Sequence, residues 1–83
     1  MTKVNTTMFS LPIERGEEIS EALAKVNQAL KEKGYNSIGQ IVGYIMSGDP
    51  SYITSHNGAR SLLAKFDRDE ILEVVFEEYL NNK

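Results

Sequence analysis

Two adjacent threonines are the side chains of this sequence best suited to regulated chemistry. Thr6 and Thr7 stand in a nearly uncharged stretch, residues 1–13, in which Lys3 is the one charged residue and no helical period is visible. A kinase could reach hydroxyls in such an arm, and a phosphate would add about −1.5 to −2 charges there. Polar linker is the commoner explanation for exposed threonines, so the residues alone leave both explanations open.

The other chemically capable side chains form no recognisable active site. His56 is the one histidine and cysteine is absent, which removes thiol catalysis, cysteine-ligated zinc and multi-histidine metal sites. Acidic residues are frequent after residue 66, but their pattern favours a solvated helix face over a cation site. No glycine-rich phosphate-binding motif occurs. We therefore expect a protein that is not an enzyme and has no metal or cofactor.

Composition narrows the class of protein further. The 83 residues, 41% hydrophobic and 25% charged, suit one small folded domain. Nine basic against twelve acidic residues give a net charge of −3, which disfavours binding to nucleic acid because that depends on clustered positive charge. No stretch approaches the roughly 20 apolar residues of a membrane span, and the first residues lack the apolar core of a secretory signal. We expect a cytoplasmic protein with no membrane insertion.

The elements that must position any binding residue are predicted to be helices. Apolar residues at steps of three and four predict a helix over residues 17–33, which Gly34 ends. The same reasoning predicts further helices over about 36–47, 56–65 and 67–80, with a short turn at 51–53. The fold class is therefore all-α, a small bundle of four main helices plus a short turn. Residues 1–13 are predicted to be a flexible N-terminal arm and residues 14–83 a helical domain for dimerisation and partner binding.

Capping signals mark where these helices begin. Ser37 and Gln40 have the spacing of a capping box at the second helix, whose alternative first residue is Asn36. Asp49-Pro50 predicts the start of the short turn, because Asp accepts bonds from free backbone N–H groups and Pro suits the first helical position. Ser55 or Asn57 is expected to cap the third helix. Asp67-x-x-Glu70 is a capping-box variant at the fourth.

Two helices carry more apolar surface than one small chain needs. The helix over 36–47 is apolar on several faces, which predicts a buried helix. The helix over 67–80 is also apolar on more than one face, and an 83-residue monomer has little protein left to bury the second face. The sequence therefore predicts a homodimer, with the helix over 67–80 as the candidate contact.

A series of short motifs gives the sequence a family resemblance. Residues 34–36 read Gly-Tyr-Asn, residues 40–44 Gln-Ile-Val-Gly-Tyr and residues 47–50 Ser-Gly-Asp-Pro, among further matches from about residue 23 to residue 80. This series closely resembles the IreB/ReoM family of small cytoplasmic regulatory proteins in Gram-positive Firmicutes. Thr7-Met8-Phe9 is similar to the family's Thr-Met segment.

The resemblance implies a specific biology. It implies a helical homodimer without catalytic activity, phosphorylated by a membrane-bound PASTA-domain Ser/Thr kinase and dephosphorylated by a cognate phosphatase. By position, the acceptor is Thr7, with Thr6 and Thr2 as less favoured neighbours. Family members govern the first committed step of peptidoglycan precursor synthesis by presenting MurA to the ClpCP protease, and phosphorylation relieves this. The chain would thus couple kinase signalling to cell-wall supply and tolerance of cell-wall antibiotics.

One segment departs from the family pattern. Where the family tends to carry Tyr-Ile-Pro-Arg-His-Lys-Asp-Ala-Arg, residues 52–60 read Tyr-Ile-Thr-Ser-His-Asn-Gly-Ala-Arg, with two fewer basic residues and no proline. If that basic surface engages partners, Arg60, Lys65 and Arg68 must carry more of the contact here. These three are the candidate partner-binding residues.

A charge switch is the mechanism that these residues suggest. A dianionic phosphate on Thr7 could fold back onto a cationic surface such as Arg60 and Lys65, or could repel an acidic partner. Two rival functions are a helix-turn-helix DNA-binding protein, using the helices over 36–47 and 56–65, and a small hydrolase using Asp49 and His56. The acidic balance disfavours the first, and the missing nucleophile motif disfavours the second.

Overall fold

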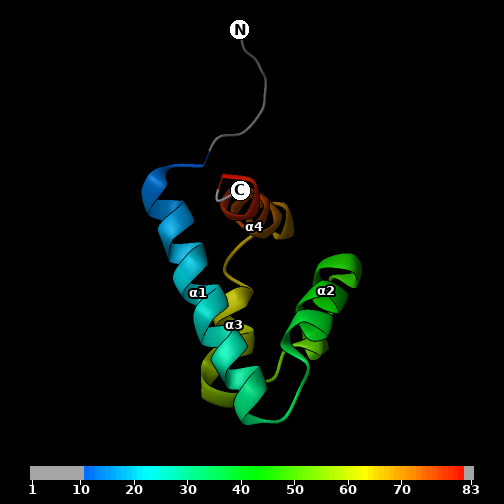
Figure 1. Cartoon of the computed structure of the whole chain (residues 1–83). Helices are drawn as coiled ribbons and strands as arrows, with labels where there is room; N and C mark the ends of the chain where they lie inside the picture. Colours follow the sequence, from blue (N-terminus) through cyan, green and yellow to red (C-terminus); the bar gives the residue numbers. More distant parts are fainter. Residues whose placement is uncertain (1–10, 82–83) are drawn as a thin grey trace, which may run out of the picture.

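The computed structural model describes residues 11–81, and within that range the chain is a helical bundle without strands (Figure 1). Its elements are α1 (Ile13–Glu32), α2 (Ser37–Ser47), the 3₁₀ turns η2 (Pro50–Tyr52) and η3 (His56–Gly58), α3 (Ala59–Leu63) and α4 (Arg68–Asn81). The long α1 contacts each of the other three α-helices. In Figure 1, α3 lies along α1, α4 lies near the first turns of α1, and α2 stands to the side. The predicted all-α class is confirmed.

The central helix α1 has the predicted apolar stripe and the predicted stop. Ile19, Ala22, Val26, Ala29 and Leu30 are buried in the core. At its end Gly34 adopts a left-handed φ of 81°, and the Tyr35 amide donates to the Leu30 carbonyl oxygen at 2.9 Å, which closes a Schellman motif. The helix begins at Ile13, one turn before the predicted Glu17, and Pro12 is its N-cap residue.

The core of the bundle is formed where α1, α3 and α4 meet. Its largest fully buried side chains come from these helices and from the turn after η2: Ile19, Val26, Leu30, Ile53, Leu63 and Ile71. Ala59 and Leu63 of α3 are buried, as is Phe66 just after the helix, and Leu62 packs against the core. The α-helix is shorter than the predicted range 56–65, because residues 56–58 form the 3₁₀ turn η3 and Asn57 has a left-handed φ of 55°.

The cap of α2 is not the predicted Ser37–Gln40 box. Asn36 is the N-cap residue, and its side-chain oxygen accepts a hydrogen bond from the Gly39 amide at 3.1 Å. Ser37 instead donates to the Asn27 carbonyl of α1 at 3.2 Å, and Gln40 donates to the Tyr52 carbonyl at 2.8 Å. The two residues therefore attach α2 to neighbouring segments. Gly48, in a left-handed conformation, ends α2 after Ser47, which agrees with the predicted range 36–47.

The predicted cap of the third helix is also wrong. Neither Ser55 nor Asn57 caps α3 with its side chain, because Gly58 is the N-cap residue at φ 72° and η3 precedes it. The two other predicted caps are present in the structure. The Asp49 side chain accepts from the Ser51 amide at 3.0 Å with Pro50 at the first position, and Glu70 accepts from the Asp67 amide at 3.0 Å.

The turn η2 lies tightly against α2. A Cβ atom built on Gly43 would come within 2.4 Å of the Tyr52 ring, so the missing side chain creates the space in which that ring lies. Together with the bond from Gln40 to the Tyr52 carbonyl, this contact connects α2 to the chain that leads into α3.

Candidate functional site

The predicted phosphorylation residues Thr6 and Thr7 lie outside the described residues. The described chain starts at Leu11, whose amide donates to the Glu73 carboxylate of α4 at 3.4 Å. Leu11 also packs against the core. The residues that precede it are therefore joined to the fold where the beginning of α1 meets α4.

The three predicted partner-binding residues have separate settings. Arg60 of α3 donates from Nε to the Ile53 carbonyl oxygen at 2.8 Å. Arg68, at the start of α4, donates from Nη1 to the Ile45 carbonyl oxygen of α2 at 2.9 Å. Lys65 is exposed and lines a shallow depression between α1 and α3 together with Lys25. The two arginines thus hold backbone carbonyls of their own chain, and Lys65 is the one of the three placed in a depression.

The position of Arg68 depends on a glycine. A Cβ on Gly48 would approach the Arg68 guanidinium carbon to 2.9 Å, and Gly48 itself has φ 75°. A side chain there would be strained and would crowd the guanidinium. Gly48 therefore serves both the end of α2 and the approach of Arg68 to that end.

An extended apolar surface of the described chain forms a groove between α1, α2 and α4, which we call the apolar groove. Its volume is about 770 Å³. Large apolar side chains from all three helices line it: Leu23, Ile38, Ile41, Val42, Ile45, Leu72, Val75 and Phe76. Ile38 is 76% exposed and Phe76 is 56% exposed. Surfaces of this kind mark sites where another molecule binds.

The apolar groove corrects the prediction of a buried α2. Of the apolar residues of that helix, Tyr44 alone is buried, while Ile38, Val42 and Met46 are largely exposed. The apolar run on several faces had indicated burial, but in the single chain one face contacts the core and another lines the groove. Helix α4 also has one buried face, which contains Ile71 and Val74, and one exposed apolar face. For this helix the exposed second face was predicted.

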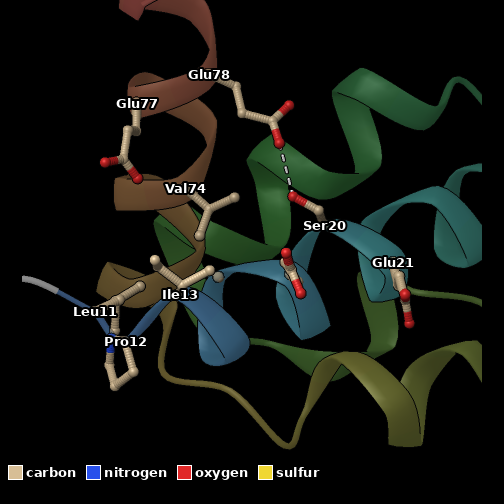
Figure 2. A pocket seen from close by; sticks show the side chains of 10 residues that line it. Leu11, Pro12, Ile13, Ser20, Glu21, Val74, Glu77 and Glu78 are labelled. Carbon is tan, nitrogen blue, oxygen red and sulfur yellow. Dashed lines mark hydrogen bonds between the residues drawn. The ribbon is translucent and has the colours of Figure 1, made fainter.

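A further depression lies between the first turns of α1 and the last turns of α4, and we call it the acidic groove (Figure 2). Its volume is about 670 Å³. Leu11, Pro12, Ile13 and Val74 supply apolar surface, and four carboxylates surround them: Glu17, Glu21, Glu77 and Glu78. Ser20 donates to the Glu78 carboxylate at 2.7 Å, which Figure 2 marks with a dashed line. The groove combines apolar surface with strong negative charge.

An ion pair fixes the other side of the same helix contact. Arg15 donates to the Glu70 carboxylate at 2.9 Å and 3.3 Å, and its guanidinium lies 4.8 Å from the centre of the Phe66 ring. The hydrogen bond from Arg15, with a further one from the Asp67 amide, lowers the pKa of Glu70 below its ordinary value. Arg15 is thus engaged away from the acidic groove.

The lone histidine has a structural partner. His56 Nε2 lies 2.8 Å from the Glu32 carboxylate at the end of α1. Hydrogen bonds from His56 and Gln28 lower the pKa of Glu32. Asp49, the other residue of the hydrolase hypothesis, is hydrogen-bonded to Ser51 by its carboxylate. The two residues have different partners and share no contact among those of the described chain.

Residues 11–81 contain neither a metal-binding cluster nor a membrane-spanning helix. No group of three or more His, Cys, Asp or Glu side chains there could hold a metal ion. No helix in that range is long and apolar enough to cross a membrane.

Comparison with known proteins identifies the class. Residues 4–81 match the profile of a family described as "IreB regulatory phosphoprotein". Because the match spans nearly the whole sequence, the chain belongs to the IreB family, as its motifs had indicated. Membership supports a regulatory role and interaction with other proteins.

Two relatives come from clostridia, and both are named only "UPF0297 protein". The protein of Ruminiclostridium cellulolyticum is 54% identical over 77 residues, which cover 93% of this chain and 88% of that protein. The protein of Acetivibrio thermocellus is 54% identical over 80 residues, 96% of this chain and 89% of that protein.

Proposed function

We propose that this protein is a non-catalytic regulatory phosphoprotein whose acceptor is Thr7, with Thr6 as the less favoured neighbour. Its kinase is a PASTA-domain Ser/Thr kinase, and a cognate phosphatase reverses the reaction. The family description as a regulatory phosphoprotein supports this assignment. The observation that carries it is the apolar groove, because exposed apolar side chains on three helices suit a protein that acts by binding others.

The proposal includes a homodimer formed through the apolar groove. The exposed apolar residues of α4, including Val75 and Phe76, lie on the helix already expected to make the contact. A second copy would supply the apolar surface that one short chain lacks, and small domains commonly gain burial in this way.

A matched pair of variants tests the dimer. Ile38 and Met46 both lie on α2 and are 76% and 79% exposed, but Ile38 lines the apolar groove and Met46 does not. Ile38→Glu should dissociate the dimer, because it introduces a charge into an apolar contact, whereas Met46→Glu should leave it intact. Sedimentation velocity at micromolar protein measures both. A monomeric wild-type chain, or equal effects of the two variants, would refute the assignment of the interface.

In the cell, the regulated process is peptidoglycan precursor synthesis. We infer that the unphosphorylated protein acts in the cytoplasm by presenting MurA to the ClpCP protease, and that phosphorylation stops this. Kinase activity would then raise MurA and with it tolerance of cell-wall antibiotics. The family resemblance supports these partners.

The phosphorylation site is tested in two steps. Incubation with the kinase followed by mass spectrometry should find the phosphate on Thr7; Thr7→Ala should abolish it and Thr6→Ala should not. In cells that lack the kinase, wild-type protein and Thr7→Ala should give the same low MurA level, and in cells with the kinase Thr7→Ala alone should keep MurA low. Phosphorylation confined to the helical domain would refute the proposed function. So would MurA levels that are the same with wild-type protein and with Thr7→Ala in cells that have the kinase.

A further inference from the structure

The acidic groove needs an occupant that is both apolar and cationic. Ile13 is 79% exposed in the groove, and Leu11, Pro12 and Val74 add to the apolar surface. The carboxylates of Glu17, Glu21, Glu77 and Glu78 approach it from two helices. Figure 2 shows Glu77 and Glu78 on α4 and Glu21 on α1, with Leu11, Pro12, Ile13 and Val74 between the two helices. An anionic or purely polar ligand would fit this groove poorly.

The chain segment that precedes Leu11 has the complementary chemistry. Residues 1–10 read Met-Thr-Lys-Val-Asn-Thr-Thr-Met-Phe-Ser. Lys3 is their one charged side chain, and Val4, Met8 and Phe9 are apolar. The segment therefore brings a positive charge and three apolar side chains to a groove with four negative charges.

The geometry of the chain allows this segment to reach the groove. Leu11 lines the groove and is covalently joined to Ser10, so the segment 1–10 is tethered at the groove and has a high effective concentration there. Lys3 lies eight residues before Leu11, a distance that an extended chain spans over roughly 26–29 Å. Along α1, Ile13 and Glu21 are separated by a rise of about 12 Å. The segment can therefore turn back and still bring Lys3 to the farthest carboxylates.

We propose that residues 3–9 of the same chain occupy the acidic groove while Thr7 is unmodified, and that phosphorylation of Thr7 displaces them. This inference rests on the proposed function, because it assigns a structural consequence to the modification of Thr7. The phosphate adds about −1.5 to −2 charges, which reverses the sign of the segment's charge and sets it against the four carboxylates. Arg15, the cation nearest in sequence on α1, is bound to Glu70 and offers that phosphate no free partner in the groove.

Paramagnetic broadening measures the docking directly. The sequence contains no cysteine, so Asn5→Cys provides one site for a nitroxide on the full chain. In ¹⁵N-labelled protein we expect strong broadening of the amide signals of Ser20 and Val74, in the groove, and little at Ala59 in α3. Phosphorylation of Thr7 by the kinase should abolish the broadening at the groove.

Two α4 variants provide the matched comparison. Glu77 and Asp69 are both exposed acids of α4, but Glu77 lines the groove and Asp69 does not. Glu77→Gln should weaken the broadening at Ser20 and Val74, while Asp69→Asn, which changes the net charge equally, should not. Equal effects would show that the whole protein's charge is responsible and would overturn the assignment to the groove.

The remaining outcomes separate this inference from the function on which it rests. Broadening that persists after mass spectrometry confirms phosphate on Thr7 overturns the displacement but leaves the phosphoprotein assignment intact. If the kinase does not modify Thr7, the proposed function fails, while the unmodified chain still tests the docking. In a mixture of nitroxide-labelled ¹⁴N protein with unlabelled ¹⁵N protein, broadening of the groove would assign the occupant to a second copy and overturn docking within the same chain.

Discussion

The contact between Gly43 and Tyr52 predicts that Gly43→Ala destabilises the protein when the Tyr52 ring is present and stabilises it when the ring is absent. A Cβ on Gly43 would lie 2.4 Å, 2.6 Å and 3.0 Å from three carbon atoms of the Tyr52 ring, so Gly43→Ala must push that ring away. Overpacking of this kind costs about 1–3 kcal/mol. Against it stands the helix propensity of Ala over Gly, worth about 1 kcal/mol inside α2. We therefore expect Gly43→Ala to destabilise the protein by about 1 kcal/mol, as the difference of these two effects.

Removal of the ring should reverse this result. In a Tyr52→Ala background the obstruction is gone and the gain in helix propensity remains, so Gly43→Ala should stabilise that variant by about 1 kcal/mol. The double-mutant cycle then gives a coupling free energy of about 2 kcal/mol. Gly16→Ala is the control, because a Cβ there meets nothing within 4 Å and should stabilise α1 by roughly 0.5–1 kcal/mol.

Urea denaturation followed by circular dichroism measures these free energies. All variants must be compared at one protomer concentration, because association of folded chains raises the apparent stability. The result that would refute the reasoning is a Gly43→Ala effect of the same sign and size in both backgrounds. It would mean that the Tyr52 ring moves away without cost and that η2 does not hold α2 through this contact.

Three further predictions concern the caps, the ion pair and the rival function. Asn36→Ala should lower the free energy of unfolding by about 1 kcal/mol in the same denaturation assay, because it removes the α2 cap. An unchanged denaturation midpoint would instead favour the Ser37–Gln40 capping box. The pKa of Glu70 is lowered from its ordinary 4.5, so its pairing with Arg15 stabilises the fold above that pH, and this stabilisation is lost as the pH falls. Glu70→Gln should therefore weaken the dependence of the unfolding free energy on pH in the acid range. Parallel pH profiles of the variant and the wild type would contradict this. Gel-shift experiments at low salt should detect no DNA binding, because residues 48–58 separate α2 from α3 where a helix-turn-helix has a short turn; a sequence-specific shift would revive that alternative.

Local patterns in the sequence were sufficient to predict the helices. The stripe of α1, its stop at Gly34 and the Asp49-Pro50 start depend on residues within a few positions of one another, and all three are present. The failures concern choices between adjacent polar residues. Asn36 rather than Ser37 caps α2 because Ser37 finds a partner in the Asn27 carbonyl of α1, ten residues away. A tertiary contact of this kind cannot be predicted from the residues next to Ser37 in the sequence.

The candidate surfaces were harder to predict than the fold. The comparison with the family pattern suggested Arg60 and Arg68 as partner-binding side chains, but both donate to backbone carbonyls that only the folded chain brings near. The apolar residues of α2 were recognised, and their exposure was not, because a sequence shows apolar character without showing what covers it. The acidic groove escaped notice because Glu17 and Glu77 come from opposite ends of the chain.

The two grooves meet on α4, and this arrangement connects the proposals made for each. Val75 and Phe76 line the apolar groove, while Val74, Glu77 and Glu78 line the acidic groove within the same turn or the next. A segment docked in the acidic groove would therefore lie beside the surface that a partner meets, and its displacement would change the charge and shape at the edge of that surface. Phosphorylation at Thr7 could then alter binding without rearranging the bundle. Comparison of the helical amide signals before and after phosphorylation tests this: shifts should be confined to α4 and the first turns of α1, and a change spread through the core residues of α3 would contradict it.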